Sequence, residues 1–186
     1  MSAPISLVVQ FIGKDRPGLI DHLSRVISEA GGNWESSRLI RLAGQFAGMI
    51  HVVIREDERA SLERDIAAVG SADGLTISVL PSPDSGASGS VPEAGPLQLE
   101  VVGQDRPGIV SAISHELAAM GANVLELATD CTNAPWSGER LFRAVASVEP
   151  RAGMPAEDVR ERIEAIASDL MVEVAFAEGT GEAENR

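Results

Sequence analysis

The chain is strongly acidic: its 186 residues include 28 Asp and Glu against 15 Lys and Arg, which gives a net charge of −13 at pH 7. This charge argues against a nucleic-acid surface, which needs clustered Lys and Arg to neutralise phosphates. No stretch approaches the roughly 20 apolar residues that span a bilayer, and the first residues lack the basic flank and apolar run of a signal peptide. A single cysteine, Cys131, excludes an internal disulfide and fits a reducing compartment. We therefore expect a cytoplasmic protein.

The first half of the chain opens with an alternating apolar run at residues 5–11, which predicts a strand. The turn sequence Gly-Lys-Asp-Arg-Pro-Gly follows at 13–18, and apolar residues at helical spacing come after it. A Gly-Gly-Asn sequence then predicts the end of that helix. The remainder of this half predicts two strands joined by a tight turn, a second helix and a last strand, at 34–42, 46–54, 57–69 and 75–80.

The second half repeats the first with an offset of 90 residues. The turn sequence recurs at 103–108 with one difference, Gln104 in place of Lys14. A repeat that keeps one register over about twenty residues indicates a duplicated unit. The elements expected in this half are strands near 97–102, 122–130, 140–148 and 171–177, and helices near 107–120 and 155–169.

Each half therefore has the order β-α-β-β-α-β, which predicts an α+β fold with two ferredoxin-like domains in tandem. In each domain we expect two helices on one face of a four-stranded antiparallel sheet. The expected boundaries are 1–81 for the first domain and 97–178 for the second. Residues 82–96, rich in Ser, Gly and Pro, predict a flexible linker, and residues 179–186 predict a frayed tail.

The repeated turn is the strongest candidate for a functional site. We expect Gly13 to let the chain leave the strand, Asp15 to cap the first helix, and Gly18 to allow another backbone or a ligand to approach closely. Free amides and the positive end of the helix dipole favour a carboxylate or a phosphate there. Gly103, Asp105 and Gly108 occupy the same places in the second half. The alternative is that these residues only shape the turn and cap the helix.

Two further pairs of residues stand near the turns in sequence. Asn33 and Asn123 begin the second strand of each half, which in this topology can lie near the first turn, and their amides can both donate and accept. The alternative role for these asparagines is the left-handed residue that ends a helix. Arg16 and Arg106 follow the aspartates; they pair with acidic groups or a ligand, or, as is more common, remain solvated.

The sequence gives no sign of catalysis. The three histidines show no spacing with Cys, Asp or Glu that suggests a metal site. There is no phosphate-binding loop of the Walker type, no dinucleotide fingerprint and no catalytic triad order. We therefore expect no metal, no cofactor and no enzymatic activity. Trp136 lies in a Pro-Trp-Ser-Gly loop, where it folds back over its own domain or contacts a partner.

The element order, the G-x-D-R-P-G turn and the G-x-N eighteen residues further on resemble the ACT domain. Two such copies without an enzyme domain, together with the stretch 135–142, resemble proteins of the glycine cleavage system transcriptional repressor type. ACT domains typically bind amino acids between the first turn of one domain and its neighbour. The resemblance therefore implies a set of ligand-binding residues: Gly13, Asp15, Gly18, Asn33, Gly103, Asp105, Gly108 and Asn123.

The resemblance implies a non-catalytic, amino-acid-binding regulatory protein. Its expected role is regulation of glycine cleavage or of related amino-acid metabolism, through a protein partner such as a transcription factor. We expect a homodimer that contacts neither nucleic acid nor membrane directly. The alternative is a ligand-free dimerisation module of ACT type, in which the turns only cap their helices.

Overall fold

The computed structural model describes residues 2–82, 95–134 and 138–178 of the chain. The described residues divide into two compact units, one in each half of the sequence. The expected linker (except Ser82 and the last residues before 97), the frayed tail and Trp136 lie outside the described residues.

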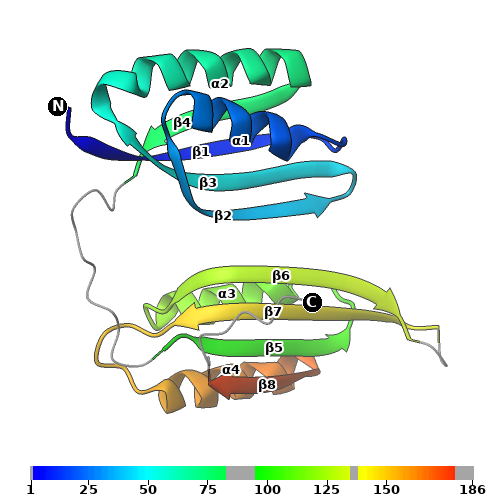
Figure 1. Cartoon of the computed structure of the whole chain (residues 1–186). Helices are drawn as coiled ribbons and strands as arrows, with labels where there is room; N and C mark the ends of the chain where they lie inside the picture. Colours follow the sequence, from blue (N-terminus) through cyan, green and yellow to red (C-terminus); the bar gives the residue numbers. More distant parts are fainter. Residues whose placement is uncertain (1, 83–94, 135–137, 179–186) are drawn as a thin grey trace. The chain divides into compact units, whose positions relative to one another are not determined.

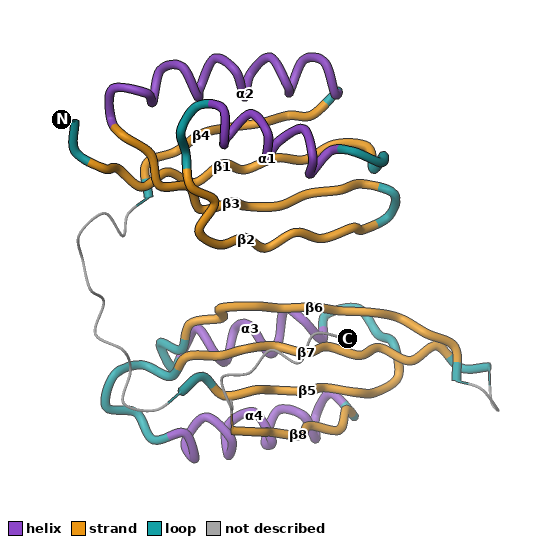
Figure 2. Tube along the Cα trace, in the orientation of Figure 1, coloured by secondary structure: helices purple, strands orange, loops and turns teal. Residues whose placement is uncertain are grey.

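The first unit has the expected order β-α-β-β-α-β, with one short 3-10 turn before its second helix (Figure 1). Its elements are β1 (Pro4–Lys14), α1 (Leu19–Glu29), β2 (Asn33–Leu42), β3 (Gln45–Arg55), η1 (Glu56–Glu58), α2 (Arg59–Asp73) and β4 (Leu75–Pro81). The strands form an antiparallel sheet in the order β2-β3-β1-β4. Both helices cover one face of this sheet, as Figure 2 shows.

The second unit repeats this architecture. Its elements are β5 (Leu97–Gln104), α3 (Ile109–Ala119), β6 (Asn123–Asn133), β7 (Arg140–Glu149), α4 (Ala156–Leu170) and β8 (Val172–Glu178). Its sheet has the equivalent antiparallel order β6-β7-β5-β8. The fold predicted from the sequence is therefore confirmed: two ferredoxin-like α+β domains in tandem.

The spacing of the apolar residues along the chain explains which side chains form the core of the first unit. Leu7, Val9 and Phe11 alternate along β1 and are buried, because every second side chain of a strand faces the helices. Leu23 and Ile27 lie one turn apart on α1 and are buried against them. Removing one such side chain from water contributes about 1.5–3 kcal/mol, so this layer holds the helices on the sheet.

The ends of several elements differ from the sequence-based expectation, and two in the first domain have a clear physical reason. The first strand was expected to end before the turn sequence, but β1 continues to Lys14, so Gly13 lies within the strand. It pairs with Phe46 on β3 and with Leu75 on β4. The helix expected at 57–69 extends to Asp73, because the left-handed residue that ends it is Gly74, with φ of 66°.

The reason for glycine at position 13 is close packing against the start of β4. A Cβ there would lie 2.5 Å from Leu75 Cδ2 and 2.9 Å from the Gly74 carbonyl oxygen. Gly103 is under the same constraint, since its Cβ would lie 2.7 Å from Val172 Cγ1. Glycine is thus required at the first position of each turn sequence, because the central strand there passes close to the turn between the second helix and the last strand of the domain. The expectation that this glycine lets the chain leave the strand is wrong.

We predict that Gly13→Ala destabilises the first domain by about 1–3 kcal/mol, because the added methyl overpacks this contact. Urea unfolding followed by the fluorescence of Trp34, which packs against the first core, measures the effect in a Trp136→Phe background. The exposed neighbour Lys14 provides the control, since Lys14→Ala should change stability by no more than about 0.5 kcal/mol. Equal stability of the Gly13 and Lys14 variants would contradict the packing argument.

Candidate functional site

The turn between the first strand and the first helix of each domain is built around a left-handed glycine. Gly18 has φ of 89° and Gly108 has φ of 99°. Each carbonyl accepts the first helical hydrogen bond, from the His22 amide at 3.0 Å and from the Ala112 amide at 2.9 Å. The amides of the first helical turn then have no partner within the helix. Beside each glycine the space is open, since a Cβ would meet no atom within 4 Å.

The aspartates of the turns do not cap the helices, and in this respect the sequence-based expectation is wrong. Neither helix has a side-chain hydrogen bond at its N-terminal cap. The carboxylate of Asp15 instead forms an ion pair with Arg41 Nε at 2.8 Å, and that of Asp105 with Arg140 Nε at 2.9 Å. The backbone amide of Asp15 also donates to the Gly44 carbonyl. These contacts tie each turn to the neighbouring strands.

The arginines of these ion pairs come from different places in the two domains. Arg41 lies on β2, where it pairs with Phe46, whereas Arg140 is the first residue of β7. In the second sheet the place of Arg41 is taken by Cys131, which pairs with Phe142. The same pair of charges is therefore built twice from non-equivalent positions. Sequence reasoning missed both arginines, because only the register of the strands brings them to the turn.

The arginine that directly follows the aspartate in each turn, Arg16 or Arg106, has different partners in the two domains. Arg16 and His22 both contact the Asp73 carboxylate at the end of α2, with His22 Nδ1 at 2.8 Å from Asp73 Oδ2. Of the roles considered for Arg16, pairing with an acidic group is the one found, and 46% of its side chain remains exposed. Arg106 donates to the Gln104 side-chain oxygen at 2.8 Å and contacts Met171 Sδ at 3.7 Å. Within the described residues Arg106 makes no ion pair, in contrast to Arg16.

The two asparagines lie away from the turns of their own domains. Asn33 pairs with Val53 on β3, and Val53 pairs with Ser6 near the start of β1. Gly13 lies seven residues further along β1, or about 23 Å at 3.3 Å per residue. The expectation that Asn33 lies near its own first turn is therefore wrong, because β1 and β2 both run antiparallel to β3 and so start at the same end of the sheet.

Asn123 is placed in the same way, because it pairs with Glu149 at the end of β7. Neither asparagine is the left-handed residue that ends the helix, a role that Gly31 and Gly121 take with φ of 76° and 71°. The Asn33 amide donates to Glu35 Oε1 at 2.5 Å. The structure thus brings the glycines and the aspartate of each turn together and leaves the asparagine apart, and its role in ligand binding remains a prediction.

Residues 2–82, 95–134 and 138–178 contain no group of three or more His, Cys, Asp or Glu side chains placed to hold a metal ion. Cys131 is exposed on β6. In that same part of the chain, every helix is too short or too polar to span a membrane.

Comparison with known proteins identifies the fold. The family model of the ACT domain matches residues 6–79, which cover β1 to β4. A crystal structure of an unknown protein from Galdieria sulphuraria is 28% identical, with a TM-score of 0.77 over 96% of this chain and 100% of that chain. A second crystal structure, of a protein provisionally described as a glycine cleavage system transcriptional repressor, is 19% identical, with a TM-score of 0.71 over the same shares.

No curated protein sequence matches the chain significantly. The family model accounts for the first domain, and the second domain repeats its strand order and its turn sequence. The first domain therefore matches the ACT domain, and the second domain has the same fold.

Proposed function

We propose that this protein is a non-catalytic regulator that binds a free amino acid at the turns of its ACT domains. The observation that carries the proposal is the Asp–Arg pair in each turn, which lies beside the first amides of a helix. An amino acid is a zwitterion, so its site needs an acceptor for the ammonium group and donors for the carboxylate. Each turn supplies both within one small region.

The pair can open to admit such a ligand at little cost. The side chain of Asp15 is 30% exposed and that of Arg41 is 71% exposed, and an ion pair in such a place contributes only about 0–1 kcal/mol. The ammonium group of the ligand would take the place of the arginine beside the aspartate. The ligand carboxylate would bind the released guanidinium and the free helical amides, which form charge-assisted hydrogen bonds.

The partners of the aspartates favour binding over catalysis. In both turns the carboxylate is held by an arginine, which stays charged and does not exchange protons near neutral pH. A general base acts by taking a proton from a reacting group, so a carboxylate held in this way is suited to hold a charge rather than to move one. We therefore propose a regulatory role without chemistry.

The regulated process is proposed from the comparison. A similar fold occurs in the protein provisionally described as a glycine cleavage system transcriptional repressor, which supports a role in glycine cleavage or related amino-acid metabolism. The net charge of −13 opposes direct contact with nucleic acid. Control would therefore pass through a protein partner such as a transcription factor, and the ligand would act by binding one state of the protein more tightly than another.

We predict that Asp105→Asn and Arg140→Gln each weaken amino-acid binding about ten- to a hundredfold, because each removes a charge-assisted hydrogen bond that contributes about 1.5–3 kcal/mol. Calorimetry with a panel of amino acids that includes glycine measures the affinity. Arg143→Gln is the matched control, since it breaks the exposed ion pair with Glu100 on the same sheet but outside the turn. Thermal melting checks that all three variants remain folded.

The outcomes of this experiment separate the possible explanations. If both turn variants bind as the wild type does, the amino-acid site lies elsewhere on the protein. If the wild type binds no amino acid at millimolar concentration, the sensing role is refuted.

A ligand-free dimerisation module is the second candidate, and the edges of the sheets favour it. The outer strands β2 and β6 carry apolar side chains that are more than half exposed, among them Ile40, Leu42 and Leu125. An outer strand also presents backbone groups that can pair with a further strand. Pairing of these edges with a second copy of the chain would cover both features.

We predict a homodimer, and we expect Ile40→Lys together with Leu125→Lys to shift it to monomer, because lysine on an outer strand opposes edge pairing. Light scattering at several protein concentrations measures the mass. Met49→Lys is the control: Met49 is similarly exposed but lies on the inner strand β3, where no edge is available. A monomeric wild-type protein would refute the prediction, and loss of the dimer in the Met49 variant would assign the contact to the sheet face.

A further inference from the structure

The sheet of the first domain carries apolar side chains on both of its faces. The helices α1 and α2 cover one face (Figure 2). On the opposite face, close to the β2–β3 turn, a group of apolar side chains is half or more exposed: Ile12 at 50%, Met49 at 51%, Ile40 at 57% and Leu42 at 68%. Ile12 and Ile40 both pair with Ala47, so they flank it on either side. We call these five residues the open-face patch.

The fold itself does not require this patch. In the second domain the strand register gives the equivalent row across β5, β7 and β6, and that row is charged. Where the first sheet has Ile12, Ala47 and Ile40, the second has Val102, Arg143 and Asp130. Arg143 also forms an ion pair with Glu100 at 2.6 Å on the same face. A sheet of this architecture can thus face water with charges, and the apolar patch of the first sheet needs another explanation.

The charges around the patch have one sign. Lys14 lies opposite Gln45, and Arg38 lies opposite Met49, on the same face as the patch. The four strands of the first sheet contain a single carboxylate, Glu35 at the β-bulge of β2, although the chain has 28 Asp and Glu. Within the described residues neither Lys14 nor Arg38 forms an ion pair. The patch is therefore bordered by two cations that lack a carboxylate.

We propose that the open-face patch is the docking site for an amphipathic helix of the protein partner, and that this helix carries carboxylates for Lys14 and Arg38. The inference rests on the protein partner in the proposed function. Contiguous exposed apolar side chains with a polar border are typical of interaction sites. Strands that are apolar on both faces, as β3 is, occur in sheets that helices cover on both sides. A helix on the open face would therefore complete a third layer.

The strand register gives the spacing of the carboxylates on such a helix. Lys14 and Arg38 lie two strands apart and four residues apart along the strands, which corresponds to about 16 Å between their Cα atoms. The line between them passes over Ala47, whose small side chain leaves a furrow between Ile12 and Ile40. A helix rises about 1.5 Å per residue, so about 11 residues, or three turns, separate carboxylates on one helical face.

The test uses the full chain and a fluorescently labelled synthetic peptide of about 20 residues that forms a helix of about 30 Å. The peptide has leucines on one face and, on the same face, two glutamates eleven residues apart; a second peptide has lysines in their place. Fluorescence anisotropy measures both affinities. We expect the glutamate peptide to bind about tenfold or more tightly, because two attractive pairs become repulsive in the lysine peptide. The net charge of −13 acts in the opposite direction, so this preference can come only from local cations.

Variants of the chain place the peptide on the patch. Ile12→Thr should weaken binding of the glutamate peptide about tenfold, since it removes apolar area from the contact. Val102→Thr is the matched control at the equivalent position of the second sheet, and it should leave the affinity unchanged. Lys14→Glu together with Arg38→Glu should reverse the preference to the lysine peptide. Thermal melting checks that each variant remains folded.

Three results would overturn the inference: no binding of the glutamate peptide at millimolar concentration, no preference over the lysine peptide, or equal effects of Ile12→Thr and Val102→Thr. Light scattering on the same variants tests a different occupant. Loss of a wild-type dimer in Ile12→Thr would assign the patch to a second copy of the chain and would also overturn the inference. If the peptides behave as expected but calorimetry detects no amino acid, the sensing role fails and the docking site stands.

Discussion

The close packing of the central strand against the helix–strand turn is the constraint on which the rest of each domain depends. Strands β1 and β5 are paired on both sides over most of their length, and their last residues pass the start of β4 and β8 with no room for a side chain at Gly13 or Gly103. This contact fixes where the strand ends and therefore where the helix can begin. The free amides of α1 and α3 are therefore held in fixed positions. A binding site with fixed donors does not have to become ordered before it can hold a ligand.

Duplication has kept the backbone of the site and changed what surrounds it. Both turns hold an aspartate against an arginine, but Arg41 and Arg140 occupy non-equivalent strand positions. Preservation of the charge pair by different routes suggests that the pair matters more than the position of its members. The cores differ in another way. Ile50 and Ala146 occupy the same register position in the two sheets, but the isoleucine side chain is larger than that of alanine. The two domains thus have the same charge pair at the turn, and they differ in the packing of their cores.

The sequence predicted the elements well because their signals are local: period two along the strands, helical spacing after the turn, and glycine at the helix ends. It predicted the site less well, because the site depends on pairing between distant segments. The distance of Asn33 from Asp15 follows from the register of β2 on β3, and no property of either residue reveals it. The same holds for Arg41 and Arg140, which reach the turns only through strand pairing. The continuation of β1 through Gly13 was not predicted, because glycine usually marks a turn.

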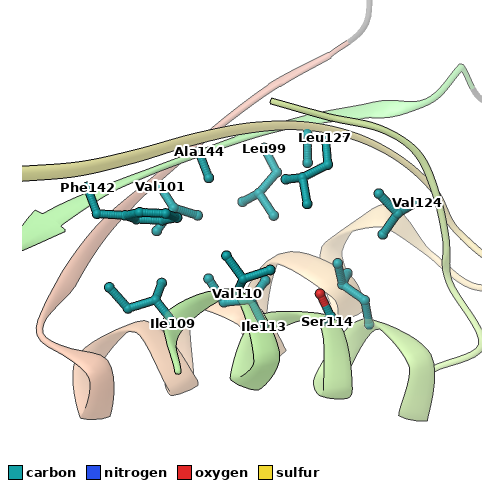
Figure 3. A pocket seen from close by; sticks show the side chains of 12 residues that line it. Leu99, Val101, Ile109, Val110, Ile113, Ser114, Val124, Leu127, Phe142 and Ala144 are labelled. Atoms are coloured by element: carbon teal, nitrogen blue, oxygen red, sulfur yellow. The ribbon is translucent and has the colours of Figure 1, made fainter. Parts of the chain in front are cut away.

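The second domain contains an apolar cavity between α3 and its sheet, lined among others by Leu99, Ile113 and Ala146 (Figure 3). This cavity has a mechanical consequence for the chain. Empty volume is lost when a domain unfolds, so hydrostatic pressure favours unfolding in proportion to the voids that a core contains. Such a cavity therefore makes the second domain easier to unfold under pressure. A molecule that fills the void would stiffen it, so occupancy could be followed as a change in compressibility as well as by heat.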